Sequence, residues 1–189
     1  MILDANIAPF INVVFQITSA WWELPREHRG LDISTGNNDP LYSMCNGTVV
    51  FSGAQTDPTT GDYAGYGNYI IMKADNGMGF LYAHMKELST KHVGDRVVIG
   101  EQVGIEGTTG DSTGNHLHLE MQDLTNHDWI YGAPKSYYEN PATFMGLPNE
   151  EGVLAIYNGT PVPPTPTITK KTKFPWVLYA RRLRNRRLY

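Results

Sequence analysis

The close spacing of turn residues constrains the fold more than any other feature of this sequence. Glycine and proline recur along the whole chain, and the apolar runs between them are short and rich in β-branched and aromatic residues. Five of these runs are typical of strands: residues 46–53, 67–75, 78–85, 93–107 (strand, turn, strand) and 116–123. Long amphipathic helical periods are scarce. The sequence therefore predicts a mostly β fold, a compact antiparallel β-sheet domain with few or no long helices.

The turn signals also suggest where the domain ends. Residues 75–79 read Asp-Asn-Gly-Met-Gly between two apolar runs, which predicts a hairpin. Residues 140–146 have the pattern of a closing segment, and the proline-rich stretch 160–167 is typical of an extended linker. We predict a folded domain over residues 1–146, a linker over 147–169 and a basic C-terminal tail over 170–189.

Length and composition exclude several classes of protein. A chain of 189 residues is long enough for one domain with a substantial core, and its 41% apolar content argues against disorder. No apolar run reaches the length of about 18 residues that a membrane span needs. The N-terminus lacks a basic region and carries Asp4, so we do not interpret it as a secretory signal. The single cysteine, Cys45, excludes an internal disulfide and is expected to be buried.

The net charge of −4 conceals an asymmetry along the chain. Residues 1–169 hold 7 basic residues and all 19 acidic ones, a net charge of −12, whereas residues 170–189 hold 8 basic residues and no acidic one. The acidic part argues against nucleic acid as a partner of the main domain. For the basic tail we expect a solvated extension or one that docks on a partner, either a carrier assembly or an anionic surface.

The stretch Gly-Asn-His-Leu-His-Leu-Glu at 114–120 raises a question about side-chain direction. On a strand, His116 and His118 share one face, and Leu117 and Leu119 share the other, which we expect to face the core. One interpretation is a solvated face with two polar residues. The other is a metal or catalytic site, because neutral imidazole is the commonest protein metal ligand.

Two further histidine motifs favour the second interpretation. His28 and Asp32 bracket a glycine, a spacing that turns both side chains toward one point as a loop enters a strand, and His84 follows an apolar strand. A catalytic zinc takes three protein ligands and keeps a fourth position for water. His28, Asp32 and one histidine of the pair His116 and His118 would supply the three ligands. His84 and the other histidine would serve as acid, base or oxyanion donor.

The order of these motifs resembles that of the lysostaphin-type (LytM) zinc endopeptidases, which cut peptide bonds in bacterial cell-wall peptidoglycan. The matching pieces are H-x-x-x-D, then Y-x-H after an apolar strand, then G-D-x-V and T-G-x-x-x-G-x-H-x-H, and together they cover residues 15–146. The resemblance implies one zinc ion on His28, Asp32 and His118, with His84 and His116 as the catalytic histidines. It also implies a groove that is floored by the sheet and walled by loops.

One departure from the family pattern concerns the region upstream of the first ligand. Family members often carry a tyrosine there that helps to hold the oxyanion, whereas this chain has Trp21 and Trp22. We expect one of these to line the groove and the other to pack in the fold. The tyrosine-rich segments 57–69 and 129–139 are expected to form groove walls that contact a peptide–sugar polymer.

The resemblance implies a function and leaves an alternative open. The chain is expected to be a zinc endopeptidase that cleaves cross-links or stem peptides of peptidoglycan at the cell wall. It would be delivered by a phage virion, released by lysis, or form part of a longer chain. The alternative is an inactive or secondary cell-wall-binding or structural module, such as a virion or spore-wall component. Pentaglycine bridges and D-alanyl-diaminopimelate links are both substrates in this family, and the sequence does not distinguish them.

Overall fold

Strands form where apolar and polar residues alternate, as they do in β1 (Val14–Ser19), whose side chains are in turn exposed and buried. A computed structural model describes residues 8–25 and 27–159. The proline-rich stretch 160–167 and the tail at 170–189 therefore lie outside the described residues. The other strands are β2 Leu31–Ser34, β3 Pro40–Tyr42, β4 Gly47–Thr56, β5 Tyr63–Ala74, β6 Met78–Met85, β7 Arg96–Val97, β8 Gln102–Ile105, β9 Leu117–Asp123, β10 Tyr138–Glu139 and β11 Leu154–Ile156.

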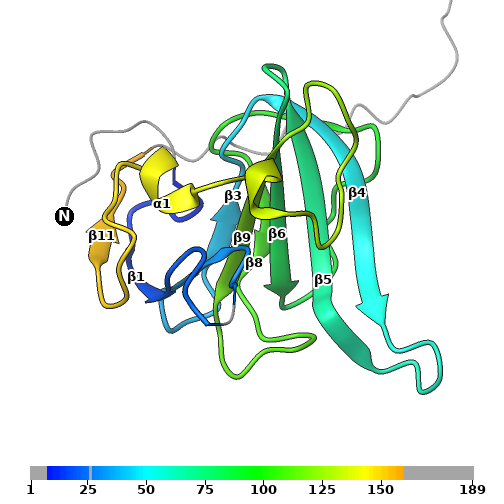
Figure 1. Ribbon diagram of the computed structural model, residues 1–189, viewed down its shortest axis with the longest axis horizontal. Helices are drawn as coiled ribbons and strands as arrows, with labels where there is room; N and C mark the ends of the chain where they lie inside the picture. The colour runs from blue at the N-terminus through cyan, green and yellow to red at the C-terminus, as the bar shows by residue number, and fades with distance from the viewer. Residues whose placement is uncertain (1–7, 26, 160–189) are drawn as a thin grey trace, which may run out of the picture.

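Nine of these strands build one large antiparallel sheet. Its order is β11-β1-β2-β9-β6-β5-β4-β7, with β10 paired to β9, and Figure 1 shows the run from β11 and β1 on one side to β5 and β4 on the other. Strands β3 and β8 form a separate two-stranded sheet. The described helices are one short α-helix, α1 (Pro141–Phe144), and one 3-10 turn, η1 (Lys135–Tyr137). The predicted mostly β, antiparallel fold is confirmed.

The predicted runs correspond closely to the central strands. Residues 46–53, 67–75, 78–85 and 116–123 become β4, β5, β6 and β9. The run 93–107 is divided between β7, which pairs with β4, and β8, which pairs with β3, so its two halves belong to different sheets. No helix in the described part of the chain has both the length and the apolar character that crossing a membrane would require.

The sheet has a large core on one face and a small apolar cluster on the other. Leu117 and Leu119 are fully buried in the large core, as predicted, and Cys45 is buried there as well. On the opposite face, Leu81 and Ala83 of β6 pack with aromatic side chains that include Tyr66. This second face carries the polar side chains of β9, so it is the face on which a site can be built.

The segment after residue 146 differs from the predicted linker. Leu147 and Ala155 are buried in the main core, and β11 pairs with β1 through three residues. Leu147 and β11 therefore belong to the core and the sheet, whereas a solvated linker would contact neither. We propose that the folded unit continues to about residue 159. The remainder of the predicted linker, 160–169, lies outside the described residues.

Candidate active site

Three neighbouring strands bring the predicted site residues together. In the antiparallel ladder, Asp32 of β2 lies directly opposite His118 of β9, and Ala83 of β6 lies opposite His118 on its other side. Directly paired residues share a face of the sheet, so Asp32 and His118 project to the same side. His28, in the loop that leads into β2, extends over this pair.

The donor atoms of these three residues form a compact triangle. The Nε2 atom of His28 lies 3.1 Å from Asp32 Oδ1 and 3.1 Å from His118 Nδ1, and His118 Nδ1 lies 2.8 Å from Asp32 Oδ1. Tetrahedral zinc with bonds of about 2.0–2.1 Å separates its ligand atoms by about 3.3 Å. Two imidazole nitrogens and one carboxylate oxygen are also the ligand types that suit zinc. The residues present therefore fit a metal ion of this kind.

Hydrogen bonds on the outer side of the histidines aim them at the triangle. The Nδ1–H group of His28 donates to the carbonyl oxygen of Ala20 at 3.0 Å, which leaves Nε2 for a metal. His118 is turned the other way, because its Nε2–H donates to Glu120 Oε1 at 3.0 Å and its Nδ1 faces Asp32. Such outer partners fix the tautomer and the ring orientation of metal-binding histidines.

A β-bulge turns His84 toward the site. Between the pairs Ile70–Tyr82 and Asn68–Met85, β6 has one residue more than β5. His84 takes a left-handed backbone conformation there, with φ of +59°. Strict alternation would place its side chain on the core face with Tyr82, whereas the extra residue redirects it, as bulges beside active sites commonly do.

His84 and His116 lie next to each other beside the triangle. Their ring centroids are 4.7 Å apart, and His116 Nε2 lies 3.8 Å from Asp32 Oδ1. The Nδ1–H groups donate to the carbonyl oxygens of Thr109 and Gly114, each at 2.8 Å. The second nitrogen of each ring, Nε2, is therefore the one available for chemistry.

A buried carboxylate holds the segment that leads to His116. Glu106 is fully buried and accepts hydrogen bonds from the Ser34 hydroxyl at 2.8 Å and from the Thr35 hydroxyl at 2.7 Å. The Ser34 hydroxyl also approaches the carbonyl oxygen of Asn115 at 2.6 Å. These contacts connect the end of β2 to the residue just before His116.

The electrostatics of the site follow from burial and close pairing. Burial alone would raise the pKa of Asp32, but hydrogen bonds from His118 and His28 outweigh it and hold that pKa well below its usual range. For His118, burial is outweighed by hydrogen bonds to Asp32 and Glu120, which raise its pKa to about 9. Burial, with the charge of His118, lowers the pKa of His84 to about 4, so His84 is neutral near pH 7.

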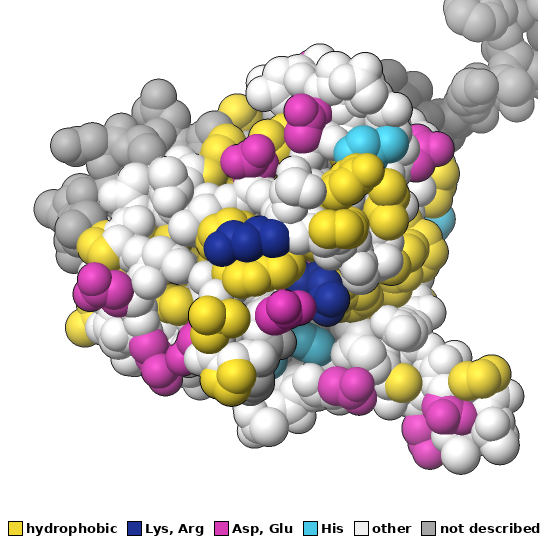
Figure 2. Space-filling model, in the orientation of Figure 1, with side chains coloured by type: hydrophobic (Ala, Val, Ile, Leu, Met, Phe, Trp, Pro, Cys, Tyr) yellow, Lys and Arg dark blue, Asp and Glu magenta, His cyan; other side chains and the backbone are white. Residues whose placement is uncertain are grey.

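All five predicted site residues line one cavity of about 710 Å³. Its walls are completed mainly by tyrosines and by the loop before β9: Tyr66, Tyr69, Tyr131, Gln55 and residues 111–113. In Figure 2, histidine surface is set back in a recess in the lower half of the molecule. Both tyrosine-rich segments therefore contribute to the walls of a groove, as the sequence predicted.

The two tryptophans do not take the place expected for one of them in the groove. Trp21 packs partly against the main core, and Trp22 contacts Tyr138, with ring centroids 5.8 Å apart. The ammonium group of Lys135 lies 4.9 Å from the Trp21 ring and 5.4 Å from the Trp22 ring. Neither tryptophan is among the residues that line the cavity. Both rings are instead packed against the core, Tyr138 and Lys135.

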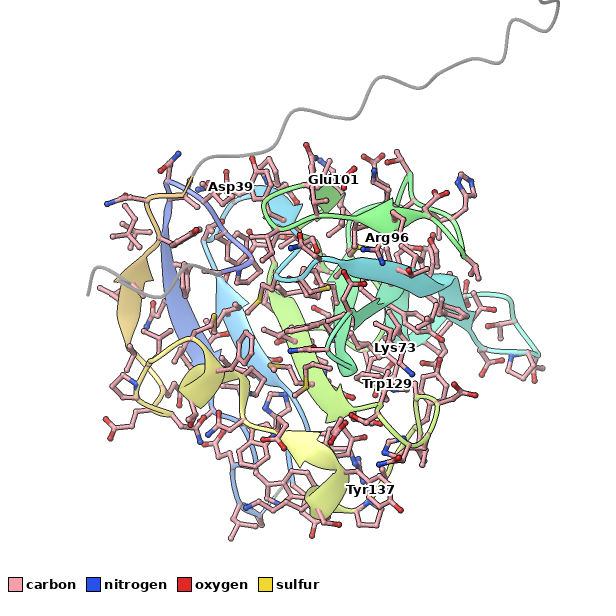
Figure 3. All side chains as sticks on the ribbon, turned by 90° about the horizontal axis from the view of Figure 1, so that it is seen from above. Asp39, Lys73, Arg96, Glu101, Trp129 and Tyr137 are labelled. Atoms are coloured by element: carbon pink, nitrogen blue, oxygen red, sulfur yellow. The ribbon has the colours of Figure 1, made fainter. Side chains whose placement is uncertain are left out.

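The sequence interpretation gave no role to Glu120 or to Tyr66's hydroxyl group. Glu120 is buried in contact with His118, and the Tyr66 hydroxyl donates to it at 2.8 Å. The sequence did contain a signal for Glu120, because a residue two positions after His118 on a strand shares the face of His118. The segment linking β9 to β10, on which Figure 3 labels Trp129 and Tyr137, supplies Tyr131, which lines the cavity next to Tyr66 and Tyr69.

Comparison with known proteins agrees with this geometry. Residues 26–130 match peptidase family M23. The DD-carboxypeptidase/endopeptidase Mpg of Neisseria meningitidis is 33% identical over 160 residues, which are 82% of this chain and 34% of that protein. The peptidoglycan DD-endopeptidase ShyA of Vibrio cholerae is 31% identical over 94 residues, 50% of this chain and 20% of that protein. The chain spans about a third of the length of Mpg and a fifth of ShyA.

Solved structures share the fold. Lysostaphin, the antimicrobial peptidase from Staphylococcus simulans, superposes with a TM-score of 0.57 at 24% identity, over 70% of this chain and 49% of that chain. A mutant catalytic domain of the prophage-encoded M23 protein EnpA from Enterococcus faecalis gives a TM-score of 0.55 at 26% identity, over 74% and 98%. Because the family match covers more than half of the sequence and includes all five site residues, the chain belongs to peptidase family M23, the LytM/lysostaphin-type peptidases.

Proposed function

We propose that this chain is a zinc-dependent endopeptidase that hydrolyses peptide bonds of bacterial peptidoglycan. The observation that carries the proposal is the triangle of His28, Asp32 and His118 donor atoms, with the imidazoles of His84 and His116 beside it in one cavity. The similarity to ShyA, a peptidoglycan DD-endopeptidase, and to Mpg, a DD-carboxypeptidase/endopeptidase, supports peptidoglycan as the substrate class.

His28 Nε2, Asp32 Oδ1 and His118 Nδ1 would hold the metal ion. When bound, zinc polarises a carbonyl group and lowers the pKa of a coordinated water toward neutrality. Asp32 supplies the single negative charge among the three ligands, and its low pKa keeps the carboxylate ionised at any physiological pH.

His84 and His116 would move protons during hydrolysis. Both rings keep Nδ1–H on a backbone carbonyl, so each can receive a proton only at Nε2. His116 Nε2 is close to the ligand triangle, 3.8 Å from Asp32 Oδ1, which suits it to take the proton of the attacking water. The pair can then return that proton to the leaving amine, as general acid–base catalysis requires.

The cavity walls would hold the peptide across this site. Tyr66, Tyr69 and Tyr131 offer flat apolar faces with polar tips, which suit a chain of small residues attached to a sugar polymer. Delivery to the wall by a virion or through lysis remains part of the proposal, and it is in keeping with the prophage origin of EnpA.

The test is digestion of purified peptidoglycan by the full chain, followed by mass analysis of the released fragments. Walls with pentaglycine bridges and walls with direct diaminopimelate links are digested in parallel, with and without a chelator. We expect new amino termini from one wall type, loss of products with the chelator, and recovery when zinc is restored. Binding to both walls without any new amino terminus would contradict the proposal and favour a wall-binding module.

A further inference from the structure

The carboxylate of Glu120 lies in a position that the proposed mechanism does not use. Its side chain is 2% exposed, and its Oε1 atom accepts two hydrogen bonds, from His118 Nε2–H at 3.0 Å and from the Tyr66 hydroxyl at 2.8 Å. Its other oxygen, Oε2, is buried without a hydrogen-bond partner among the described residues. A buried carboxylate with an unsatisfied oxygen costs stability, so an apolar residue would serve the fold better here.

The position of Glu120 determines which nitrogen of His118 faces the ligand triangle. An imidazole that donates from Nε2 to a carboxylate has Nδ1 free to bind a metal. Asp32, the other carboxylate that contacts His118, lies on the Nδ1 side at 2.8 Å. Without Glu120, the ring would lose the bond that holds Nε2 away from the triangle, and its Nε2–H would be buried without a partner.

Tyr66 connects this carboxylate to the groove. Its ring lines the cavity and lies 5.9 Å from the His118 ring, while its hydroxyl group is directed at Glu120 Oε1. The same oxygen therefore accepts from a wall residue and from a predicted metal ligand. Two donors on one oxygen hold that oxygen in place more firmly than His118 alone would.

We propose that Glu120 is a positioning residue that holds Nδ1 of His118 toward the metal, and that the Tyr66 hydroxyl holds Glu120 in turn. The inference rests on the proposed zinc site and extends it to two residues that bind no metal. It assigns Glu120 no contact with the substrate. Its effect on the reaction passes through His118.

Zinc affinity of the full chain, measured by competition with a chromophoric chelator, tests this inference. The variants are Glu120→Ala, Glu120→Gln and Tyr66→Phe. Tyr69→Phe is the matched control, because Tyr69 lines the same cavity but its hydroxyl group pairs with Tyr131 at 3.1 Å. Circular dichroism and thermal melting of each zinc-free variant report whether the fold is intact.

We expect a graded loss of affinity. Removing an outer partner of a metal-binding histidine weakens metal binding about 10–100-fold, which we predict for Glu120→Ala. Glu120→Gln keeps an acceptor oxygen but loses the charge, so a loss of about 3–10-fold is expected. Tyr66→Phe should lose about 2–5-fold, since one hydrogen bond to Glu120 is removed, and Tyr69→Phe should stay within about twofold of the original chain.

A spectroscopic readout separates positioning from a general structural role. In the zinc-loaded chain, the Nε2 proton of His118 should give a far-downfield, slowly exchanging resonance. It should move upfield in Glu120→Gln and stay in place in Tyr69→Phe. If Glu120→Ala fails to fold, Glu120→Gln and Tyr66→Phe still decide the question through affinity and this resonance.

Folded Glu120 variants that bind zinc as tightly as the original chain, with the resonance unmoved, would overturn the inference and leave the proposed function standing. An equal loss in Tyr69→Phe would also overturn it, because the effect would then belong to the groove and not to Glu120. If the original chain binds no zinc at all, the proposed function and this inference both fail.

Discussion

Each histidine of the site donates a hydrogen bond from one ring nitrogen to a protein oxygen, and this bond determines which nitrogen is left for a metal or a proton. His28, His84 and His116 bond through Nδ1 to backbone carbonyls and present Nε2, whereas His118 bonds through Nε2 to Glu120 and presents Nδ1. The sequence predicted which residues meet, because motif order and strand alternation carry that information. It could not predict which nitrogen of each ring is free, because that depends on how the surrounding backbone carbonyls and the Glu120 carboxylate are oriented in the folded chain.

Removing either proposed catalytic histidine should separate metal binding from turnover. His84→Ala and His116→Ala leave the three donor atoms intact, so we expect both variants to keep zinc. Both should lose about 10²–10⁴-fold in the hydrolysis rate, the usual contribution of acid–base groups. Zinc content and initial rates on one soluble peptide substrate measure the two effects. Near-original turnover in either variant would exclude that histidine from the chemistry.

Gly30 provides a sharp test of how closely the site is packed. A Cβ atom at this position would lie 2.5 Å from Cε1 and 2.6 Å from Nε2 of the His118 ring, so Gly30→Ala must displace that ring. We expect a loss of zinc affinity of about tenfold or more. Gly114→Ala is the matched control, because a Cβ there meets nothing within 4 Å. Full zinc affinity in Gly30→Ala would show that His118 is not held as described.

The charged pair of Asp32 and His118 predicts how the metal-free chain responds to pH. The pKa of His118 is raised from 6.5 to about 9, so its proton stabilises the folded state fully below pH 6.5. That contribution is lost as the pH rises through about 9. We therefore expect the Tm of the chelator-treated chain to fall between pH 6.5 and 9 in melts at constant ionic strength. A Tm that rises across this window would contradict the pairing.

At the scale of elements, apolar runs and turn residues predicted β4, β5, β6 and β9, whereas β1, β3, β10 and β11 were not among the predicted runs. β4, β5, β6 and β9 are long and bounded by glycine or polar turns, so their patterns are clear. β3, β10 and β11 have two or three residues each, too few to show a period. The bulge at His84 is also invisible in the sequence, because alternation alone directs that side chain into the core.

Because β11 pairs with β1, we expect that a chain shortened to residue 146 is less stable than one that keeps β11. A chain that ends at residue 146 loses Leu147 and the β11 pairing with β1. It also loses Asn149, whose side chain bonds the backbone of Trp21 twice at 2.9 Å, next to the loop that carries His28. We expect a loss of stability of roughly 3 kcal/mol or more, since truncating one buried leucine side chain to alanine alone costs about 2–5 kcal/mol.

A chain that ends at residue 159 is the matched control for this truncation. It keeps Leu147, Asn149 and β11, so it should melt close to the full chain and bind zinc equally well. Thermal melts of the two shortened chains give the comparison. Equal stability of both would return the domain boundary to residue 146, as the sequence pattern first indicated.

At the scale of the whole molecule, the site depends on strands that are distant in sequence. Asp32 and His118 are 86 residues apart, and the groove walls come from the β4–β5 hairpin, the loop before β9 and the segment after it. The family resemblance predicted a groove of this kind, since the order of the motifs carries the topology. The sequence also predicted that its two tyrosine-rich segments line this groove. The absence of Trp21 and Trp22 from its lining depends on loop packing, which the sequence does not show.

The measurement that tests the central claim most directly is the zinc content per chain of the purified protein and of Asp32→Ala. The carboxylate of Asp32 supplies one of the three donor atoms, and His28, Asp32 and His118 form the one group of this kind among the described residues. We predict one zinc per chain in the original protein and little or none in Asp32→Ala. A full equivalent of zinc in Asp32→Ala, or none in the original chain, would contradict the assignment of His28, Asp32 and His118 as the metal site.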